Sequence, residues 1–102
     1  MIAQFSIFPL GAGTSVRAHV AKAIEEVDAS GLVYRVTAMG TIVEGEWDAV
    51  MKVIKKIRDR VLENSDRVYL TISIDERRDK KVTIDSKMQA VEAAVGRRLC
   101  RS

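Results

Sequence analysis

The feature that most constrains this chain is the order of two kinds of apolar spacing along it. Four short segments alternate apolar and polar residues, as half-buried strands do, and two longer segments between them repeat apolar residues at helical spacing. The order is strand, helix, strand, strand, helix, strand, with Gly40 as a tight connection between the second and third strands. With a right-handed crossover in each half, this order places both helices on one face of a four-stranded antiparallel sheet.

Turn and capping residues set the expected limits of these elements. Thr14 or Ser15 is expected to cap the first helix and Gly31 to end it, while Gly45 opens the second. Thr83 is expected to cap a third helix, with apolar residues at 84, 88, 91, 95 and 99. The expected strands are 2–8, 32–39, 41–44 and 67–74. The sequence therefore predicts an α+β, ferredoxin-like βαββαβ sandwich with an extra C-terminal helix.

The length leaves room for one hydrophobic core, so residues 1–102 are predicted to form a single domain. A domain of this size hides only about 60–65% of its unfolded surface, so an oligomeric partner is favourable. The longest apolar run is too short for a membrane-spanning helix, and no signal peptide is visible at the N-terminus. A single cysteine, Cys100, excludes an internal disulfide framework. These observations predict a cytoplasmic protein.

The charge distribution argues against a nucleic-acid-binding surface. Lys and Arg number 17 against 14 Asp and Glu, a net charge of +3. Arg97, Arg98 and Arg101 near the C-terminus account for the whole excess. The basic charge therefore belongs to a terminal segment and not to a broad binding face. We expect neither a nucleic acid nor a membrane as partner.

The sequence offers little for catalysis or for a metal. His19, the only histidine, lies at the edge of the first helix's apolar stripe and is expected to pack there. Cys100 has basic neighbours, but nothing around it builds a nucleophile site. Asp75 and Glu76 are followed directly by Arg77 and Arg78, so these charges are expected to neutralise one another. The sequence thus predicts a protein that is not an enzyme and holds no metal or cofactor.

The sheet face that no helix covers is the candidate binding surface. It mixes aromatic and aliphatic side chains with short hydrogen-bonding groups, which is typical both of an interface and of a pocket for a small polar ligand. A third reading is that the polar groups satisfy one another across a dimer interface. The residues expected on this face are Ile2, Gln4, Ser6, Phe8, Val33, Arg35, Thr37, Met39, Ile42, Glu44, Tyr69, Thr71, Ser73 and Asp75.

Four segments carry a resemblance to a known family. They are Ala3–Gly11, Thr37–Thr41, Glu44–Asp48 and Asp75–Asp79. In this order and spacing, the chain resembles the thiamine-binding protein family. The resemblance implies a ferredoxin-like domain that assembles through its sheets into homodimers or homotetramers. It also implies binding of thiamine or its hydroxymethylpyrimidine moiety without turnover.

The residues of the open face suit this class of ligand. Thiamine has a flat aminopyrimidine with donors and acceptors on one edge, and a permanently cationic thiazolium. Glu44 would accept the exocyclic amine or face the cation. Trp47 would offer a cation–π contact, although its helical phase favours the core, and Arg77 would hold a carboxylate or another subunit's loop. Gln4, Ser6 and Thr37 would form the hydrogen-bonding edge, and Phe8, Met39 and Ile42 the apolar walls.

Two other functions stay open at this point. One is a regulatory module that senses a small metabolite, with an anion held near the turn Gly11-Ala12-Gly13 at the start of the first helix. The other is a purely structural module that only assembles with itself. The first predicts stabilisation by anionic metabolites such as amino acids, and the second predicts no response to any ligand.

Overall fold

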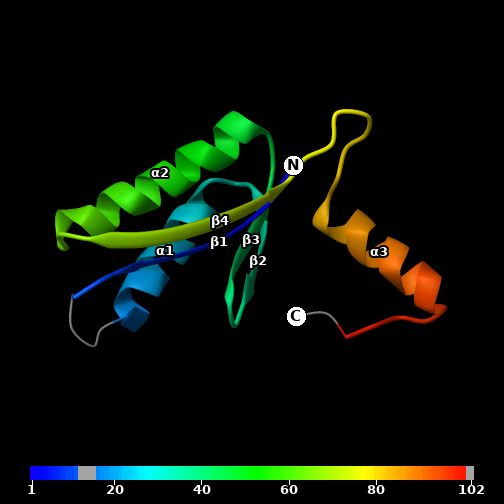
Figure 1. The fold of residues 1–102 in the computed structure, drawn as a ribbon, viewed down its shortest axis with the longest axis horizontal. Helices are drawn as coiled ribbons and strands as arrows, with labels where there is room; N and C mark the ends of the chain where they lie inside the picture. Colours follow the sequence, from blue (N-terminus) through cyan, green and yellow to red (C-terminus); the bar gives the residue numbers. More distant parts are fainter. Residues whose placement is uncertain (12–15, 101–102) are drawn as a thin grey trace.

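The expected order of elements is present in the structure, a computed structural model that describes residues 1–11 and 16–100 (Figure 1). The expected caps of the first helix, Thr14 and Ser15, and part of the Gly11-Ala12-Gly13 turn lie outside the described residues. The elements are β1 (Ile2–Pro9), α1 (Val16–Ala29), β2 (Val33–Thr37), β3 (Gly40–Glu44), α2 (Trp47–Glu63), β4 (Val68–Asp75) and α3 (Ile84–Val95). The α+β, ferredoxin-like fold with an extra C-terminal helix is confirmed.

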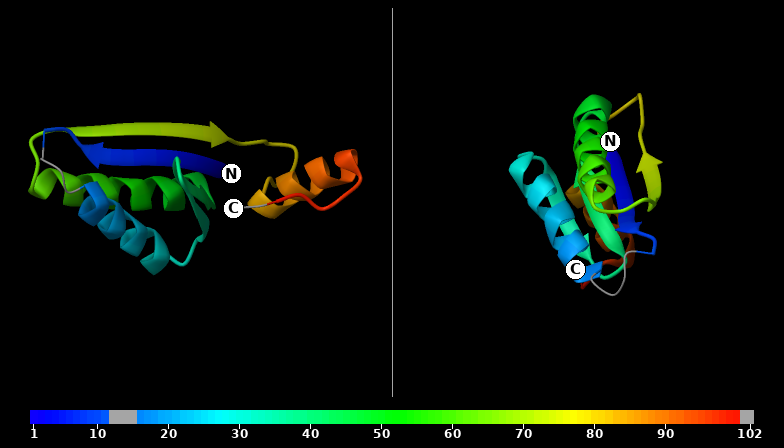
Figure 2. Two further views of the ribbon diagram at one scale, coloured as in Figure 1. Left: turned by 90° about the horizontal axis from the view of Figure 1, so that it is seen from below. Right: turned by 90° about the vertical axis from the view of Figure 1, so that its left-hand side faces the viewer.

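The four strands form one antiparallel sheet in the order β2-β3-β1-β4. Helices α1 and α2 lie on the same face of this sheet and leave the other face without a helix over it (Figure 2). In β1 the residues that face the helices are buried and their neighbours are not, so the predicted alternation is confirmed. Direct pairing of Gln4 with Ile42 and with Ser73 carries this alternation into β3 and β4.

The hydrophobic core lies between the sheet and the two helices. Helix α2 supplies most of the helical part, because its apolar residues recur every three or four positions. Trp47 differs from the expectation: it is 48% exposed. The reason is its place at the start of α2, close to the sheet end where the Gly45 amide donates to the Met1 carbonyl (3.0 Å). The core comprises Ala3, Phe5, Ile7, Ala23, Val27, Val43, Val50, Val53, Ile54, Ile57 and Val61.

The edge strand β2 is less buried than its sequence suggests. Alternation with the expected open-face residues of this strand would place Leu32, Tyr34, Val36 and Ala38 toward the core. However, Val36 is 44% exposed and Ala38 is exposed in the turn. Leu32 and Tyr34 pack against the core and are half-buried. Because β2 has a neighbour on one side only, its far end receives little cover from α1, and Val20 of α1 is itself 40% exposed.

Helix α3 begins where the sequence predicts and ends earlier. Thr83 accepts from the Ser86 amide (3.0 Å), and the Ser86 hydroxyl accepts from the Thr83 amide (3.1 Å), which forms a capping box. Gly96, with a φ of +87°, ends the helix, so Leu99 lies beyond it. The helix extends past the end of the sheet (Figures 1 and 2). It packs on no strand or helix as closely as α1 and α2 do.

The described residues contain neither a membrane-spanning helix nor a cluster of metal ligands. No helix among them is both long and apolar enough to cross a membrane. In residues 1–11 and 16–100, no group of three or more His, Cys, Asp or Glu side chains is placed to hold a metal ion.

Gly40 is the glycine whose lack of a side chain the fold requires most clearly. A Cβ built there would lie 2.9 Å from the Phe5 carbonyl oxygen, a backbone atom that has no freedom to move aside. We expect Gly40→Ala to lower the free energy of unfolding by about 1–3 kcal/mol, measured by urea denaturation. The control is Gly45→Ala, whose Cβ would meet the flexible tip of Leu32 at 3.1 Å. Equal losses in the two variants would contradict this explanation.

Candidate functional site

The open sheet face is defined by the side chains of the four strands that point away from α1 and α2. The strand pairing puts every expected residue of the strands themselves on this face, while Met39 lies in the β2–β3 turn and is 83% exposed. At one end the rings of Phe8 and Tyr69 are in contact, with centroids 5.5 Å apart. Toward the other end the pairs Ser6–Thr71 and Gln4–Ser73 form a polar band. The face therefore changes from aromatic to polar along β1.

A shallow depression on this face, here called the face hollow, lies at its polar end. It has a volume of about 210 Å³ and is lined by Ile2, Gln4, Ile42, Ser73, Ile74 and Asp75. Gln4 lies between Ile42 of β3 and Ser73 of β4. Its side-chain amide has no hydrogen-bond partner in the part of the chain that the structure describes. A primary amide offers a donor and an acceptor side by side, so Gln4 can read the edge of a flat polar ring.

Two carboxylates flank the face hollow. Ile2 pairs with Glu44 on one side and with Asp75 on the other, so both carboxylates lie one strand away from β1 at the same end of the sheet. Lys87 of α3 donates to Asp75 Oδ2. This hydrogen bond, together with the charge of Lys87, holds the pKa of the Asp75 carboxyl below its usual range. Asp75 is therefore ionised at neutral pH.

Glu44 has a structural contact that its position in the sequence does not reveal. Its Oε2 accepts a hydrogen bond from the Ile84 amide at the start of α3 (3.0 Å). Close by, Arg35 donates to Asp85 Oδ1 (2.6 Å). The first turn of α3 is thus attached to the open sheet face by three side chains of that face, Glu44, Arg35 and Asp75. A carboxylate at a helix N-terminus is also stabilised by the helix dipole.

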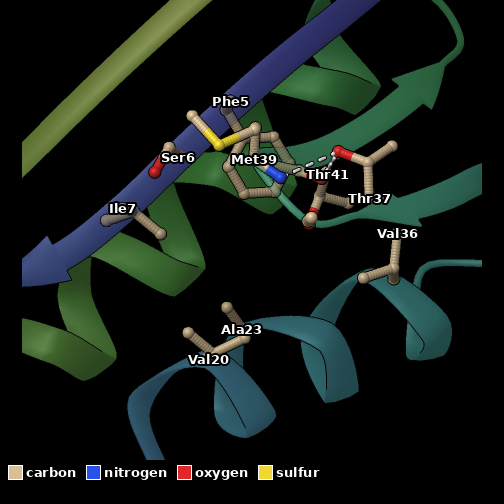
Figure 3. Close-up of a pocket in the computed structure, with 11 residues that line it drawn as sticks. Phe5, Ser6, Ile7, Val20, Ala23, Val36, Thr37, Met39 and Thr41 are labelled. Carbon is tan, nitrogen blue, oxygen red and sulfur yellow. Dashed lines mark hydrogen bonds between the residues drawn. The ribbon is translucent and has the colours of Figure 1, made fainter. Parts of the chain in front are cut away.

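A second depression, here called the hairpin cavity, lies between β1, α1 and the β2–β3 hairpin (Figure 3). Its volume is about 160 Å³, and β1, α1 and the hairpin supply its walls. Three of the expected binding residues line it: Ser6, Thr37 and Met39. The Thr37 hydroxyl is engaged in the turn, since it donates to the Gly40 carbonyl (2.8 Å) and accepts from the Met39 amide (3.2 Å). Thr37 thus serves first to shape the hairpin.

The sequence and fold place this chain among known proteins. Residues 3–92 match the family described as thiamine-binding protein. The chain belongs to the thiamine-binding protein family. The resemblance carried by the four sequence segments is thereby confirmed, and this family member shares its fold with solved structures.

Three known proteins are similar to this chain over most of its length. The UPF0045 protein MJ1052 of Methanocaldococcus jannaschii is 43% identical over 91 residues, covering 89% of this chain and 91% of the relative. Its crystal structure matches with a TM-score of 0.82, over 88% of this chain and 93% of that one. UPF0045 protein YqgV of Bacillus subtilis is 41% identical, covering 88% of this chain and 92% of its own length. A Bacillus cereus domain of unknown function is 37% identical, with a TM-score of 0.77 and coverage of 84% in both chains.

The nine expected binding residues of this family member do not lie together in the structure. Gln4 and Ile42 line the face hollow, and Ser6, Thr37 and Met39 line the hairpin cavity. Glu44 lies next to Ile2 of the face hollow but lines a third cavity, together with Lys81, Val82 and Thr83. Phe8 lies at the aromatic end of the open sheet face. Trp47 lies at the start of α2, and Arg77 binds Asp79 (2.9 Å) in the loop before α3.

Ser73 and Asp75 were expected on the open sheet face but not among the binding residues, and both line the face hollow. Asp75 was expected to be neutralised by its arginine neighbours, but its ion-pair partner is Lys87, twelve residues on, while Arg77 pairs with Asp79. The available signal was the alternation of β4, which puts both residues opposite β1 positions on the same face.

The Asp75–Lys87 ion pair predicts how the stability of the fold depends on pH. Because the pKa of Asp75 is lower in the folded chain, the pair stabilises the fold above about pH 3.9, and this contribution is lost as the pH falls through the folded pKa. Lys87→Met is expected to raise the pKa of Asp75 toward about 3.9, followed by NMR titration of the carboxyl carbon. Lys52→Met, on the exposed side of α2, is the control and should leave this pKa unchanged. An unchanged pKa in Lys87→Met would contradict the assignment.

Proposed function

We propose that this chain binds thiamine or its hydroxymethylpyrimidine moiety in the face hollow, without turnover, and that a second copy of the chain closes the site. Membership of the thiamine-binding protein family supports the class of ligand. The observation that carries the location is the Gln4 side-chain amide, which has apolar and polar neighbours and no partner among the described residues.

The aminopyrimidine fits the chemistry around Gln4. Its exocyclic amine and adjacent ring nitrogen present a donor next to an acceptor, which is the complement of a primary amide. Ile2 and Ile42 offer apolar surface on which a flat ring can lie, and the Ser73 hydroxyl adds a further hydrogen-bonding group. Ligand sites commonly combine such apolar walls with a few convergent polar groups.

The cationic thiazolium is the reason to expect a role for the flanking carboxylates. Asp75 lines the hollow and Glu44 lies across Ile2 from it. Charge-assisted contacts of this kind contribute about 1.5–3 kcal/mol when well formed. Asp75 already binds Lys87, so the cation has to compete with that lysine. Hydroxymethylpyrimidine carries no such charge and is expected to depend on Gln4 more than on either carboxylate.

The size of the hollow explains why a second copy is part of the proposal. Ligand clefts usually enclose about 300–1,000 Å³, whereas the face hollow measures about 210 Å³ and is open to one side. A neighbouring copy laid over the open sheet face would enlarge the cleft and exclude water from it. Homo-oligomers of this kind are mostly symmetric, so each copy would both hold and close a site.

We also propose that the protein is located in the cytoplasm, as predicted from its sequence.

Isothermal titration calorimetry tests the proposed function. We expect thiamine and hydroxymethylpyrimidine each to give saturable binding heat, and the isolated thiazolium moiety to bind much more weakly. Chromatography of the ligand after incubation is expected to return it unchanged. Absence of heat with both pyrimidine compounds would overturn the proposed ligand, and a converted ligand would overturn binding without turnover.

A further inference from the structure

Helix α3 leaves the body of the protein with an apolar side uncovered. Its first turn is held by the contacts of Glu44, Arg35 and Asp75, and Ile84 there is 6% exposed. Beyond that turn, Met88, Val91 and Val95 are 36%, 48% and 51% exposed. These three residues, here called the α3 stripe, recur at helical spacing and so share one side of the helix. The apolar side of α3 thus continues past the point where its own domain covers it.

The dimensions of the chain show that the exposed surface is larger than a monomer of this size needs. The radius of gyration is 15.1 Å, against about 13 Å for a compact domain of about 100 residues. The accessible surface is 7082 Å², against about 5,700 Å² expected from the mass. The difference between these two areas is larger than the surface of about 800 Å² that each partner buries in a standard interface. The chain therefore exposes enough surface for a second copy to bury on assembly.

A helix of this length also needs a packing partner. Isolated helices shorter than about 12–15 residues are marginal in water, even when their sequences are rich in alanine. Helix α3 has 12 residues, and no other described helix or strand packs closely on it. The segment after it touches it where the Leu99 amide donates to Glu92 Oε2 (2.7 Å). Its stability is expected to come from burial of the α3 stripe against something outside its own domain.

We propose that the α3 stripe docks on the open sheet face of a second copy of this chain, so that each copy's helix covers its partner's sheet. This inference rests on the sheet-face assembly proposed above and names the element that covers the face. The α3 stripe and the open sheet face are both partly apolar and uncovered, and a reciprocal arrangement covers both at once. Pairing α3 with the partner's α3 would leave the sheet face bare.

The lengths of the two surfaces agree. A 12-residue helix is about 18 Å long, and the eight-residue strands β1 and β4 are each about 26 Å long. The helix therefore fits within the length of the face. It would lie over the side chains of β1 and β4, with the polar side of α3, including Gln89, turned to solvent. The partner's helix would then form part of the wall of the face hollow.

Cross-linking between two differently marked chains tests this arrangement. Both chains carry Cys100→Ser, which removes the natural thiol. One chain adds Val91→Cys, and the other adds Thr71→Cys and an affinity tag that changes its size. After mixing, a short bismaleimide linker is expected to join the two chains, and this product is expected to need both introduced cysteines. Light scattering of the wild-type protein is measured alongside.

Each outcome bears on a different part of the proposal. The mixed product supports docking of α3 on the partner's sheet. A product of Val91→Cys chains only would overturn it in favour of paired α3 helices, and no product from a dimeric protein would overturn it while leaving the sheet-face assembly in place. A wild-type mass of 11.3 kDa, that of one chain, would overturn both. As a second variant, Val91→Asp is expected to shift the mass toward one chain, and Gln89→Asp is expected not to.

Discussion

Ile54→Ala is expected to lower the free energy of unfolding by about 2–5 kcal/mol. Ile54 is 2% exposed and is among the largest fully buried side chains of the core between α2 and the sheet. The substitution removes three carbons from a position that its neighbours cannot refill without moving the sheet. Urea denaturation at fixed protein concentration measures the loss, because assembly adds to the apparent stability.

The control for this variant is Lys56→Ala on the exposed side of the same helix. Lys56 is solvent-exposed, and surface substitutions of this kind usually change stability by less than about 0.5 kcal/mol. A similar loss in both variants would show that the effect comes from helix propensity or assembly, and would contradict the placement of Ile54 in the core. The comparison thus tests the packing of α2 against the sheet that contains β1 and Gln4.

Gln4→Ala is expected to weaken binding of thiamine and of hydroxymethylpyrimidine by at least tenfold, measured by calorimetry. The substitution removes the amide that the proposed site presents to the pyrimidine edge. Loss of a hydrogen bond to a buried polar group costs about 1–3 kcal/mol, and about 1.4 kcal/mol corresponds to tenfold in affinity. Because the Gln4 side chain is exposed on the sheet, its removal is expected to leave the fold intact.

Gln89→Ala provides the matched control, since it removes the same side chain from an exposed position on α3. Unchanged affinity in Gln4→Ala, in a protein that binds the ligand, would move the site away from the face hollow. Glu44 needs a more careful substitution. Because Glu44 also caps α3, Glu44→Gln separates the loss of charge from the loss of the cap better than Glu44→Ala does.

Much of the fold was predictable because its determinants are local. The alternation in β1 and β4 fixes which side chains face the helices, and a slip of one residue would have buried Gln4 and exposed Phe5. The cap at Thr83 was equally visible, since its partner Ser86 is only three residues away. The exposure of Val36 and Trp47 was not, because it depends on where each element ends relative to its neighbours.

The candidate site was only partly predictable, for a related reason. Register places Gln4 beside Ile42 and Ser73, and alternation alone is enough to find that grouping. The contacts of Glu44 with Ile84 and of Asp75 with Lys87 join segments that are far apart in sequence, across a loop whose path no local pattern determines. The polar band of the open sheet face was therefore predictable from the sequence, whereas the attachment of α3 to that face was not.

An NMR titration of the isotope-labelled protein with thiamine tests most directly whether the ligand lies on the open sheet face. We predict that the backbone amide signals of Gln4, Ile42 and Ser73 shift in a saturable way, while those of Val36 and Thr37 at the hairpin cavity move little. Shifts confined to the hairpin cavity, or to the core side of α1 and α2, would contradict binding at the uncovered side of the sheet.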